Sequence, residues 1–236
     1  MLLNIVDLNV RIDGLSILED VSLDVREGEI VVVVGANGAG KSTLMHCIAG
    51  LRKPVSGTIE FRDEFIQSAP PNTLASKGLT LIPEGRLLFH DMTVLENLQL
   101  GAYYYRKDEA RIKENMKKVF ELFPVLEENK NRKANTFSGG QQQMLSIGRG
   151  LMSEPKLLMI DELSLGLAQN IIHMLFKTVK TLNDNGVSIL MVEQNVSQAL
   201  KVADRAYVLD NGKIVLSGTG AELISNEHVR KAYMGL

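Results

Sequence analysis

The chain has no tryptophan and a single cysteine, Cys47, among its 236 residues. One cysteine cannot form a disulfide within the chain, which suits a reducing compartment. The chain also has no large excess of charge of either sign, because 28 acidic and 26 basic residues give a formal net charge of −2. No whole-chain field therefore favours nucleic acid or anionic lipid, and we expect no nucleic-acid partner.

Long apolar runs are missing as well. A run such as residues 30–34 is far shorter than the roughly 20 residues that span a bilayer. The first ten residues lack a basic stretch followed by an apolar stretch and a small-residue cleavage site, so they do not resemble a signal peptide. We expect a protein that is soluble by itself and that reaches a membrane only through a partner.

The residues that are present suit one domain with an ordinary core, because 45% are hydrophobic and 23% are charged. Residues 30–34 are apolar on both faces, which is typical of a central strand in a parallel α/β sheet. Strands are predicted at residues 2–9, 21–25, 30–34, 57–61, 78–82, 156–160, 188–192, 205–209 and 213–216. The turn Asp210-Asn211-Gly212 predicts a hairpin between the last two.

Helical periodicity replaces the strand pattern in the middle of the chain. Helices are predicted at residues 41–49, 94–100, 106–123 and 139–152, with a loop at Pro124 and residues 127–133. Strands that alternate with helices favour a mostly parallel sheet. We therefore predict one domain over residues 1–236, in which residues 1–86 and 156–236 form an α/β core and residues 87–155 an inserted helical subdomain.

A glycine-rich turn follows the predicted central strand and opens a helix, and residues 35–42 match GxxxxGK[ST]. Glycines let the backbone approach phosphate closely, and the helix N-terminus adds a favourable dipole. Lys41 is expected to reach the β- and γ-phosphates of ATP, and the Ser42 hydroxyl to bind Mg²⁺. The residues expected to hold the nucleotide here are Gly35, Asn37, Gly38, Ala39, Gly40, Lys41, Ser42 and Thr43. Cys47, on the same helix, is expected to be a packed core residue.

Two carboxylates end the predicted strand at residues 156–160. Asp161 is expected to hold Mg²⁺, and Glu162 to orient or deprotonate the attacking water. Many strands end in an acidic turn, so the prediction depends on the phosphate loop upstream.

A second segment has the same physical logic as the phosphate loop. Ser138, Gly139, Gly140 and Gln141 open a predicted helix, with a hydroxyl and bare N–H groups at its positive end. An ordinary N-cap explains the serine. Two glycines in a first helical turn cost roughly 1 kcal/mol each, and a cap does not need them, so we interpret them as allowing close approach to an anion.

These motifs resemble those of ABC ATPases, and residues 137–143 resemble the LSGGQ signature of that family. The chain is most similar to the ATPase subunits of branched-chain amino acid importers, in particular to their second ATPase subunit. Four segments carry this closer resemblance: PEGR at residues 83–86, SLGLA at 164–168, VEQN at 192–195 and the tail at 226–235.

The resemblance implies an α/β fold: a P-loop NTPase (RecA-like) core with an N-terminal antiparallel β subdomain and an inserted helical subdomain. It implies ATP and Mg²⁺ as cofactors, and two ATPs sandwiched between two ATPase subunits, each signature closing on the other subunit's nucleotide. It also implies integral-membrane permease subunits, an indirect role for a periplasmic substrate-binding protein, and a peripheral location on the cytoplasmic side of the membrane. Tyr103, Tyr104 and Tyr105 border the implied permease groove, although we expect them to pack at a helix end.

The chain departs from the family pattern at several positions. Glu84 stands where most members have glutamine, at the γ-phosphate and metal site. Gln194 stands where most have a catalytic histidine, and an amide cannot carry a proton charge. Ile12 occupies the place of the usual adenine-stacking aromatic residue. Leu163 and Gln169 replace prolines in the turn after Glu162.

Other functions remain possible from the sequence alone. Urea or short-amide import is the alternative cargo, since the ATPase does not touch the transported molecule. A soluble ABC ATPase of DNA repair or translation is a second alternative, although the chain lacks long heptad arms and a second cassette. A GTPase or small-molecule kinase is a third, although no Asn-Lys-x-Asp motif is present. Homodimer and heterodimer both stay open.

Overall fold

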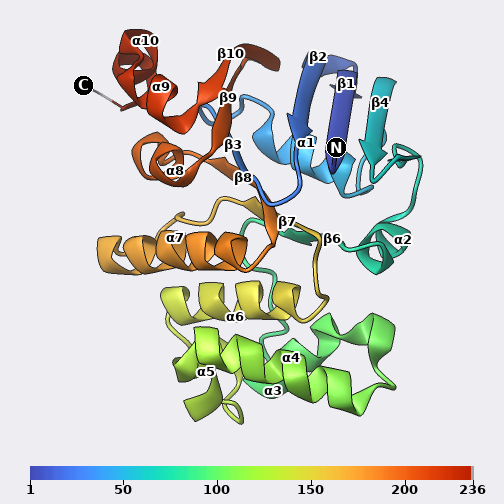
Figure 1. The fold of residues 1–236 in the computed structure, drawn as a ribbon, viewed down its shortest axis with the longest axis vertical. Helices are drawn as coiled ribbons and strands as arrows, with labels where there is room; N and C mark the ends of the chain where they lie inside the picture. Colours follow the sequence, from blue (N-terminus) through green and yellow to red (C-terminus); the bar gives the residue numbers. More distant parts are fainter. Residues whose placement is uncertain (235–236) are drawn as a thin grey trace.

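Ten strands form two sheets in the part of the chain that the computed structural model describes, residues 1–234 (Figure 1). The larger sheet has the order β10-β9-β3-β8-β7-β6, and only its edge strand β10 is antiparallel to its neighbour. Its strands are β3 (Ile30–Val34), β6 (Leu79–Ile82), β7 (Leu157–Asp161), β8 (Ser188–Glu193), β9 (Arg205–Asp210) and β10 (Lys213–Thr219). The predicted parallel sheet and the hairpin between β9 and β10 are confirmed.

The smaller sheet confirms the antiparallel N-terminal subdomain. It has the order β2-β1-β4-β5, built from β1 (Leu3–Ile12), β2 (Leu15–Val25), β4 (Ser56–Phe61) and β5 (Glu64–Phe65). Helix α1 (Lys41–Ile48) shares a core with this sheet and with one face of the larger one. Cys47 is buried in that core, as expected.

Strand β3 explains why residues 30–34 are continuously apolar. Alternate side chains of a strand point to opposite faces. Val31 and Val33 pack in the core shared with α1, whereas Ile30, Val32 and Val34 pack in the core on the other face. All five residues of β3 are buried, so the predicted central strand is confirmed.

Helices gather at the end of the molecule opposite the smaller sheet (Figure 1). This group comprises α3 (Val94–Gly101), α4 (Glu109–Leu122), α5 (Pro124–Glu128) and α6 (Gly139–Leu151), with 3₁₀ turns at Tyr103–Tyr105 and Ala134–Thr136. Thr93 and Ser138 each form a capping box, with Glu96 and Gln141 respectively, and so fix where α3 and α6 begin. The other helices are α2 (Pro71–Ser76), α7 (Gln169–Asp184), α8 (Val196–Val202), α9 (Gly220–Ser225) and α10 (Glu227–Val229), followed by a π-helical segment at Arg230–Met234.

Several element boundaries differ from the sequence predictions. Strand β2 begins at Leu15, because residues before 21 also pair with β1. Pro124 starts α5 instead of marking a loop, since proline at the first helical position loses no hydrogen bond. Helix α4 begins only after Asp108, whose side chain accepts from the Arg111 N–H. The tail segment compared above ends at Gly235, which lies outside the described residues.

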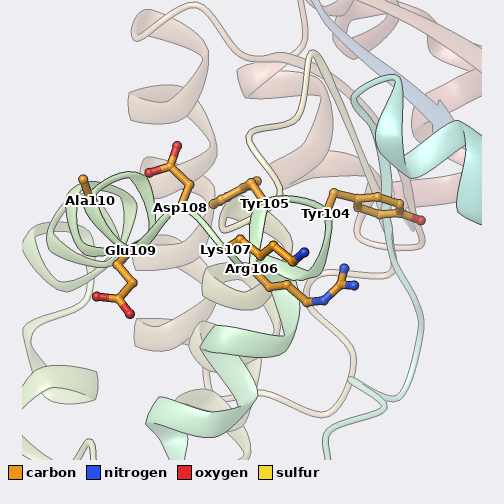
Figure 2. A pocket seen from close by; sticks show the side chains of 7 residues that line it. All are labelled: Tyr104, Tyr105, Arg106, Lys107, Asp108, Glu109 and Ala110. Carbon is orange, nitrogen blue, oxygen red and sulfur yellow. The ribbon is translucent and has the colours of Figure 1, made fainter.

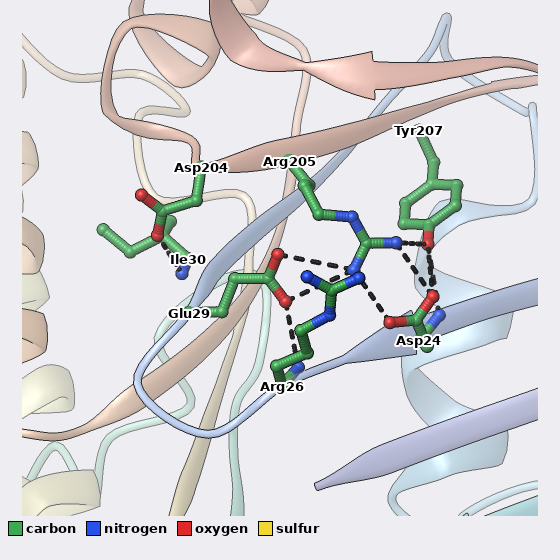
Figure 3. Close-up of polar contacts among 7 residues, drawn as sticks. All are labelled: Asp24, Arg26, Glu29, Ile30, Asp204, Arg205 and Tyr207. Carbon is green, nitrogen blue, oxygen red and sulfur yellow. Dashed lines mark hydrogen bonds and ion pairs between the residues drawn. The ribbon is translucent and has the colours of Figure 1, made fainter. Parts of the chain in front are cut away.

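Arg205 joins the two sheets through a network of charged groups (Figure 3). From β9, its Nη1 and Nη2 each donate to an Asp24 carboxylate oxygen on β2 over 2.8 Å. Its Nη1 also lies 3.3 Å from both oxygens of Glu29, in the turn before β3. The Tyr207 hydroxyl donates to Asp24 over 3.1 Å. A bidentate pair of this kind has a defined geometry and fixes the smaller sheet against the larger one.

Substituting Asp24→Asn is expected to lower the free energy of unfolding by about 1 kcal/mol near neutral pH. The hydrogen bonds from Arg205 lower the pKa of Asp24, so this stabilisation is present above the ordinary value near 4 and is lost as pH falls through the lowered one. Urea denaturation at about pH 7 and about pH 3 measures the difference. The difference in free energy of unfolding between the parent and the variant should be largest at about pH 7 and smaller at about pH 3. An equal difference at both pH values would contradict the assignment. Glu114→Gln, which breaks an exposed ion pair with Lys118, is the matched control and should have little effect.

Candidate nucleotide-hydrolysis site

The predicted site residues follow three neighbouring strands of the parallel sheet. Carboxyl ends of parallel strands meet at one edge, so the loops after β3, β7 and β8 lie together. The register aligns Val34 with Glu193 and Asp161 with Val192. The phosphate loop, the acidic pair and Gln194 are thereby brought to one place.

The loop at residues 35–42 needs glycine at particular positions. A Cβ at Gly35 would lie 2.2 Å from the Leu209 carbonyl oxygen, and one at Gly40 would lie 2.7 Å from Leu18 Cδ2. Gly40 has a φ of +106° and Gly38 a φ of +80°, in the region that favours glycine. In the part of the chain that the structure describes, no side chain caps α1, so the N–H groups of its first turn are available to an anion.

Lys41 lies inside the loop that it closes and is only 4% exposed. Its Nζ donates to the carbonyl oxygens of Gly35 at 3.0 Å and Ala36 at 3.1 Å. The same nitrogen lies 3.7 Å from Glu162 Oε1. The ammonium therefore stands between the loop and the acidic pair, where its charge can act on both a phosphate and Glu162.

One carboxylate oxygen of Asp161 has no hydrogen-bond partner within residues 1–234. The Ser42 hydroxyl donates to Oδ1 over 3.1 Å, whereas Oδ2 is buried without a hydrogen bond among the described residues. Burial raises the pKa of Asp161 to about 6, the hydrogen bond from Ser42 opposes the shift, and the negative charges of Glu84 and Glu162 add to it. An unpaired carboxylate oxygen beside a hydroxyl fits a hard divalent cation such as Mg²⁺, which prefers oxygen ligands.

Glu84 does not contact Ser42 or Asp161 through a hydrogen bond within residues 1–234. Its negative charge nevertheless helps to raise the pKa of Asp161. Residues 1–234 also contain no group of three or more His, Cys, Asp or Glu side chains arranged to hold a metal. Metal ligation by Glu84 stays a prediction.

The Glu162 carboxylate accepts hydrogen bonds from the side-chain amide of Gln194, the residue found at the position of the family's usual histidine. Gln194 Nε2 lies 2.5 Å from each Glu162 carboxylate oxygen. The backbone of Glu162 has a φ of +55°, and its N–H donates to the Val192 carbonyl over 3.1 Å. The arrangement presents a buried carboxylate beside Lys41, and such a carboxylate can orient or deprotonate water.

The second segment predicted to bind an anion forms an N-cap in this structure. The Ser138 Oγ accepts from the Gln141 N–H over 3.4 Å, and the Ser138 N–H donates to Gln141 Oε1 over 3.0 Å. A Cβ at Gly140 would lie 2.9 Å from Ile171 Cγ2. Packing against α7 is therefore a second reason for a glycine at position 140. The close approach of an anion to Gly139 and Gly140 stays a prediction.

Arg86 is a neighbour of the signature that the sequence did not reveal. Its guanidinium nitrogens lie 3.3 and 3.5 Å from the place of a Cβ at Gly139. The Arg86 carbonyl accepts from Ser146 Oγ at 3.0 Å and Arg149 Nη2 at 3.2 Å, and the Leu87 carbonyl accepts from Arg149 Nη1 at 2.9 Å. The segment that contains Glu84 is therefore fastened to α6. The PEGR pattern was the only sequence signal for it.

Ile12 ends β1 opposite Leu15. The smaller sheet meets the phosphate loop at a different point, through Leu18 and the carbonyl of Ile17, which lies 3.1 Å from the place of a Cβ at Gly40. The adenine contact predicted for Ile12 stays a prediction.

The tyrosines at residues 103–105 differ in exposure. Tyr105 is half-buried and its hydroxyl donates to the Met152 carbonyl, whereas Tyr103 is 56% and Tyr104 44% exposed. Figure 2 shows Arg106 and Lys107 between Tyr104 and the acidic residues Asp108 and Glu109. The expectation of packing is confirmed for Tyr105 alone.

The fold and this site define a class. A glycine-rich loop between a buried strand and a helix, a buried lysine and an acidic strand end at one edge of a parallel sheet are the parts of a P-loop nucleotide-hydrolysing protein. The chain belongs to the ABC transporter family, whose model matches residues 18–164, and is therefore an ATP-binding, ATP-hydrolysing cassette.

Known proteins similar to the chain agree with this class. It is 50% identical to the "High-affinity branched-chain amino acid transport ATP-binding protein BraG" of Pseudomonas aeruginosa, over 92% of this chain and 93% of that protein. It is 30% identical to a solved structure of the ADP conformation of MJ1267, an ATP-binding cassette of an ABC transporter, with a TM-score of 0.88 over 100% and 99% of the two chains.

A more distant cassette shares the fold. The dimeric structure of the post-hydrolysis state of MJ0796, bound to ADP and Pi, is 24% identical, with a TM-score of 0.79 over 92% of this chain and 98% of that one. Among residues 1–234, no helix is both long enough and apolar enough to cross a membrane.

Proposed function

We propose that this chain powers the import of branched-chain or other hydrophobic amino acids, from the cytoplasmic side of the membrane and through integral-membrane permease subunits. One observation carries this proposal: the chain is half identical, over nearly the full length of both, to a branched-chain amino acid transport ATPase. A substrate-binding protein on the far side of the membrane would deliver the cargo.

The chemistry divides among the residues at the sheet edge. Lys41 neutralises the β- and γ-phosphates, while N–H groups of residues 35–43 bind their oxygens. Ser42 and Asp161 would hold Mg²⁺, which would supply further positive charge to the phosphates. Glu162 orients the attacking water and accepts its proton, and Gln194 fixes the position of that carboxylate. The neutral amide leaves Glu162 as the only member of this pair that exchanges a proton.

The site is shared between two cassettes. Within the described residues, Ser138 and Gly139 have neighbours in residues 86, 141 and 167, and no hydrogen bond joins them to the phosphate loop. One ATP does not use two separate anion-binding segments of one chain. We propose that Ser138, Gly139, Gly140 and Gln141 bind the nucleotide of a second ATPase subunit, either a copy of this chain or a sister ATPase.

Residues 87–155 form the helical unit that receives the permease. A groove of about 370 Å³ lies between this unit and β6, lined among others by Pro83, Phe89, Leu100, Tyr103 and Tyr104. Leu87 is 66% and Phe89 52% exposed beside it. An apolar rim of this kind suits a short loop of a membrane subunit. Arg149 of α6 donates hydrogen bonds to the carbonyl oxygens of residues 86 and 87. A permease loop that displaced these residues would therefore also displace Glu84 and the signature at the start of α6.

The test of the proposed cargo is uptake in proteoliposomes that contain the permease subunits, this chain and the binding protein. ATP-dependent uptake of labelled leucine is expected, and it should be lost with Glu162→Gln. Uptake of urea or short amides without leucine would establish the alternative cargo. ATP hydrolysis that no permease stimulates would favour a soluble ABC ATPase instead.

The role of Gln194 has its own test. Gln194→His is expected to preserve or raise ATP turnover, because an imidazole N–H can replace the amide donor to Glu162. Gln194→Ala removes the donor and is expected to lower kcat by about 10-fold or more. Steady-state ATP hydrolysis measures both. A large loss in the histidine variant would show that the amide has another function.

A further inference from the structure

Glu193 is a buried carboxylate that none of the roles above uses. It ends β8, one residue before Gln194, and is 1% exposed. One of its oxygens accepts from the Ser164 N–H at 3.0 Å. The other accepts from the Ser164 hydroxyl at 2.8 Å and from the Asn195 N–H at 3.4 Å. Two of these three donors are backbone N–H groups, which cannot accept, so both oxygens of Glu193 act as acceptors.

This contact is one half of a reciprocal link between two strand ends. From the loop after β8, Gln194 donates to Glu162 after β7, while Ser164 after β7 donates to Glu193 at the end of β8. Glu162 has a φ of +55°, a conformation that a non-glycine residue keeps only when its surroundings hold it. Ser164, two residues later, is joined to Glu193 through both its N–H and its hydroxyl.

The hydrogen bonds to Glu193 also act against the cost of its burial. Burial raises the pKa of Glu193, and the hydrogen bonds from the Ser164 hydroxyl and from the backbone N–H groups of Asn195 and Ser164 oppose that shift. The buried carboxylate and the turn at Ser164 therefore stabilise each other.

The turn after Glu162 also lies against the start of α6, the helix that begins with the signature. A Leu167 methyl group lies 3.5 Å from the place of a Cβ at Gly139, and Ile171 packs on Gly140. A displaced turn would thus disturb both the phosphate site and the start of α6.

We propose that Glu193 is a positioning residue for hydrolysis: by binding Ser164 and the turn that begins at Leu163, it keeps the Glu162 carboxylate within reach of Gln194 and of the attacking water. This inference rests on the proposed role of Glu162. A misplacement of a catalytic group by about 1 Å can lower the rate about 100-fold without altering how substrate binds.

The experiment compares kcat and KM for MgATP, and the dissociation constant for a fluorescent ATP analogue, in Glu193→Ala, Glu193→Gln and Ser164→Ala. Glu193→Ala is expected to lower kcat by about 10- to 100-fold with KM and nucleotide affinity nearly unchanged. Glu193→Gln keeps one acceptor oxygen, and its amide can donate to the Ser164 hydroxyl, so it should recover most of the loss. Ser164→Ala should lower kcat by a smaller factor. The double variant Glu193→Ala/Ser164→Ala should raise the activation free energy by less than the sum of the two single increases.

Glu29→Ala is the matched control, since Glu29 is also a buried carboxylate but belongs to the Arg205 network. It should lower stability and leave kcat per nucleotide-binding molecule unchanged. Glu193→Ala with the kcat of the parent, or with a loss that only follows its binding-competent fraction, would overturn the proposal. If Glu193→Ala does not fold, Ser164→Ala, which removes one hydroxyl, gives the answer: an unchanged kcat would overturn it. Turnover in Glu162→Gln is measured in parallel, and retention there would instead overturn the role of Glu162.

Discussion

Glu162→Gln is expected to lower ATP turnover by at least about 100-fold while nucleotide affinity changes little. Gln194 Nε2 lies 2.5 Å from both Glu162 oxygens, and an amide at position 162 can still accept from it. Glutamine has the size of glutamate and keeps one of its two acceptor oxygens, so the change in the site is small. What is lost is a group that accepts a proton from water, since an amide does not act as a base at neutral pH.

Two measurements check this result. Steady-state phosphate release gives turnover, and titration with a fluorescent ATP analogue gives affinity. Light scattering in the presence of MgATP should show a dimer of the variant that persists, because the bound nucleotide is not hydrolysed. Glu121→Gln, an exposed glutamate on α4, is the control and should behave as the parent. Turnover near the parental rate in Glu162→Gln would remove Glu162 from the mechanism.

Lys41→Ala is expected to weaken nucleotide binding by about 10-fold or more and to lower turnover by at least about 100-fold. The ammonium is held by two carbonyl oxygens at 3.0 and 3.1 Å in a nearly inaccessible position. A larger guanidinium does not fit between them, so Lys41→Arg should not restore activity. Its charge also lies 3.7 Å from Glu162, so its loss removes a cation close to that carboxylate.

Calorimetry with ATP and with ADP separates the two contributions of Lys41. Because it is expected to reach the β- and γ-phosphates, affinity for ATP should fall at least as much as affinity for ADP. Lys180→Ala, which removes an exposed ammonium from α7, is the control. ATP affinity and turnover at parental levels in Lys41→Ala would contradict the assignment of residues 35–42 as the phosphate loop.

The parts of the site that the sequence predicted are those built from consecutive residues. The phosphate loop needs glycines at fixed spacing, and β3 needs apolar residues on both faces, so both can be recognised in the chain itself. The hairpin at Asp210-Asn211-Gly212 is a local signal too, because Asn211 and Gly212 both have positive φ.

The parts that escaped prediction depend on residues far apart in the chain. Arg86 reaches Gly139 only because α6 packs beside the loop after β6, and Gly140 packs closely against Ile171 from another helix. In the sequence, Glu193 directly follows the strand predicted at residues 188–192, and nothing marks it as functional. Its contact with Ser164 exists only in the folded protein. The PEGR, SLGLA and VEQN segments contain these residues, but a motif does not say which residues touch, because such contacts arise from tertiary packing.

The sharing of the ATP site between two chains is tested most directly by mixing two inactive variants. Lys41→Ala disables the phosphate loop. Ser138→Asp keeps an N-cap for α6, since aspartate caps as well as serine, but places a negative charge where phosphate is expected. In a mixed dimer, one site would contain both changes and the other neither. Each variant alone should be nearly inactive, and an equimolar mixture should recover roughly a quarter of parental ATP turnover, because half of the dimers would carry one intact site. A mixture as inactive as its components would contradict a site shared between two copies of this chain.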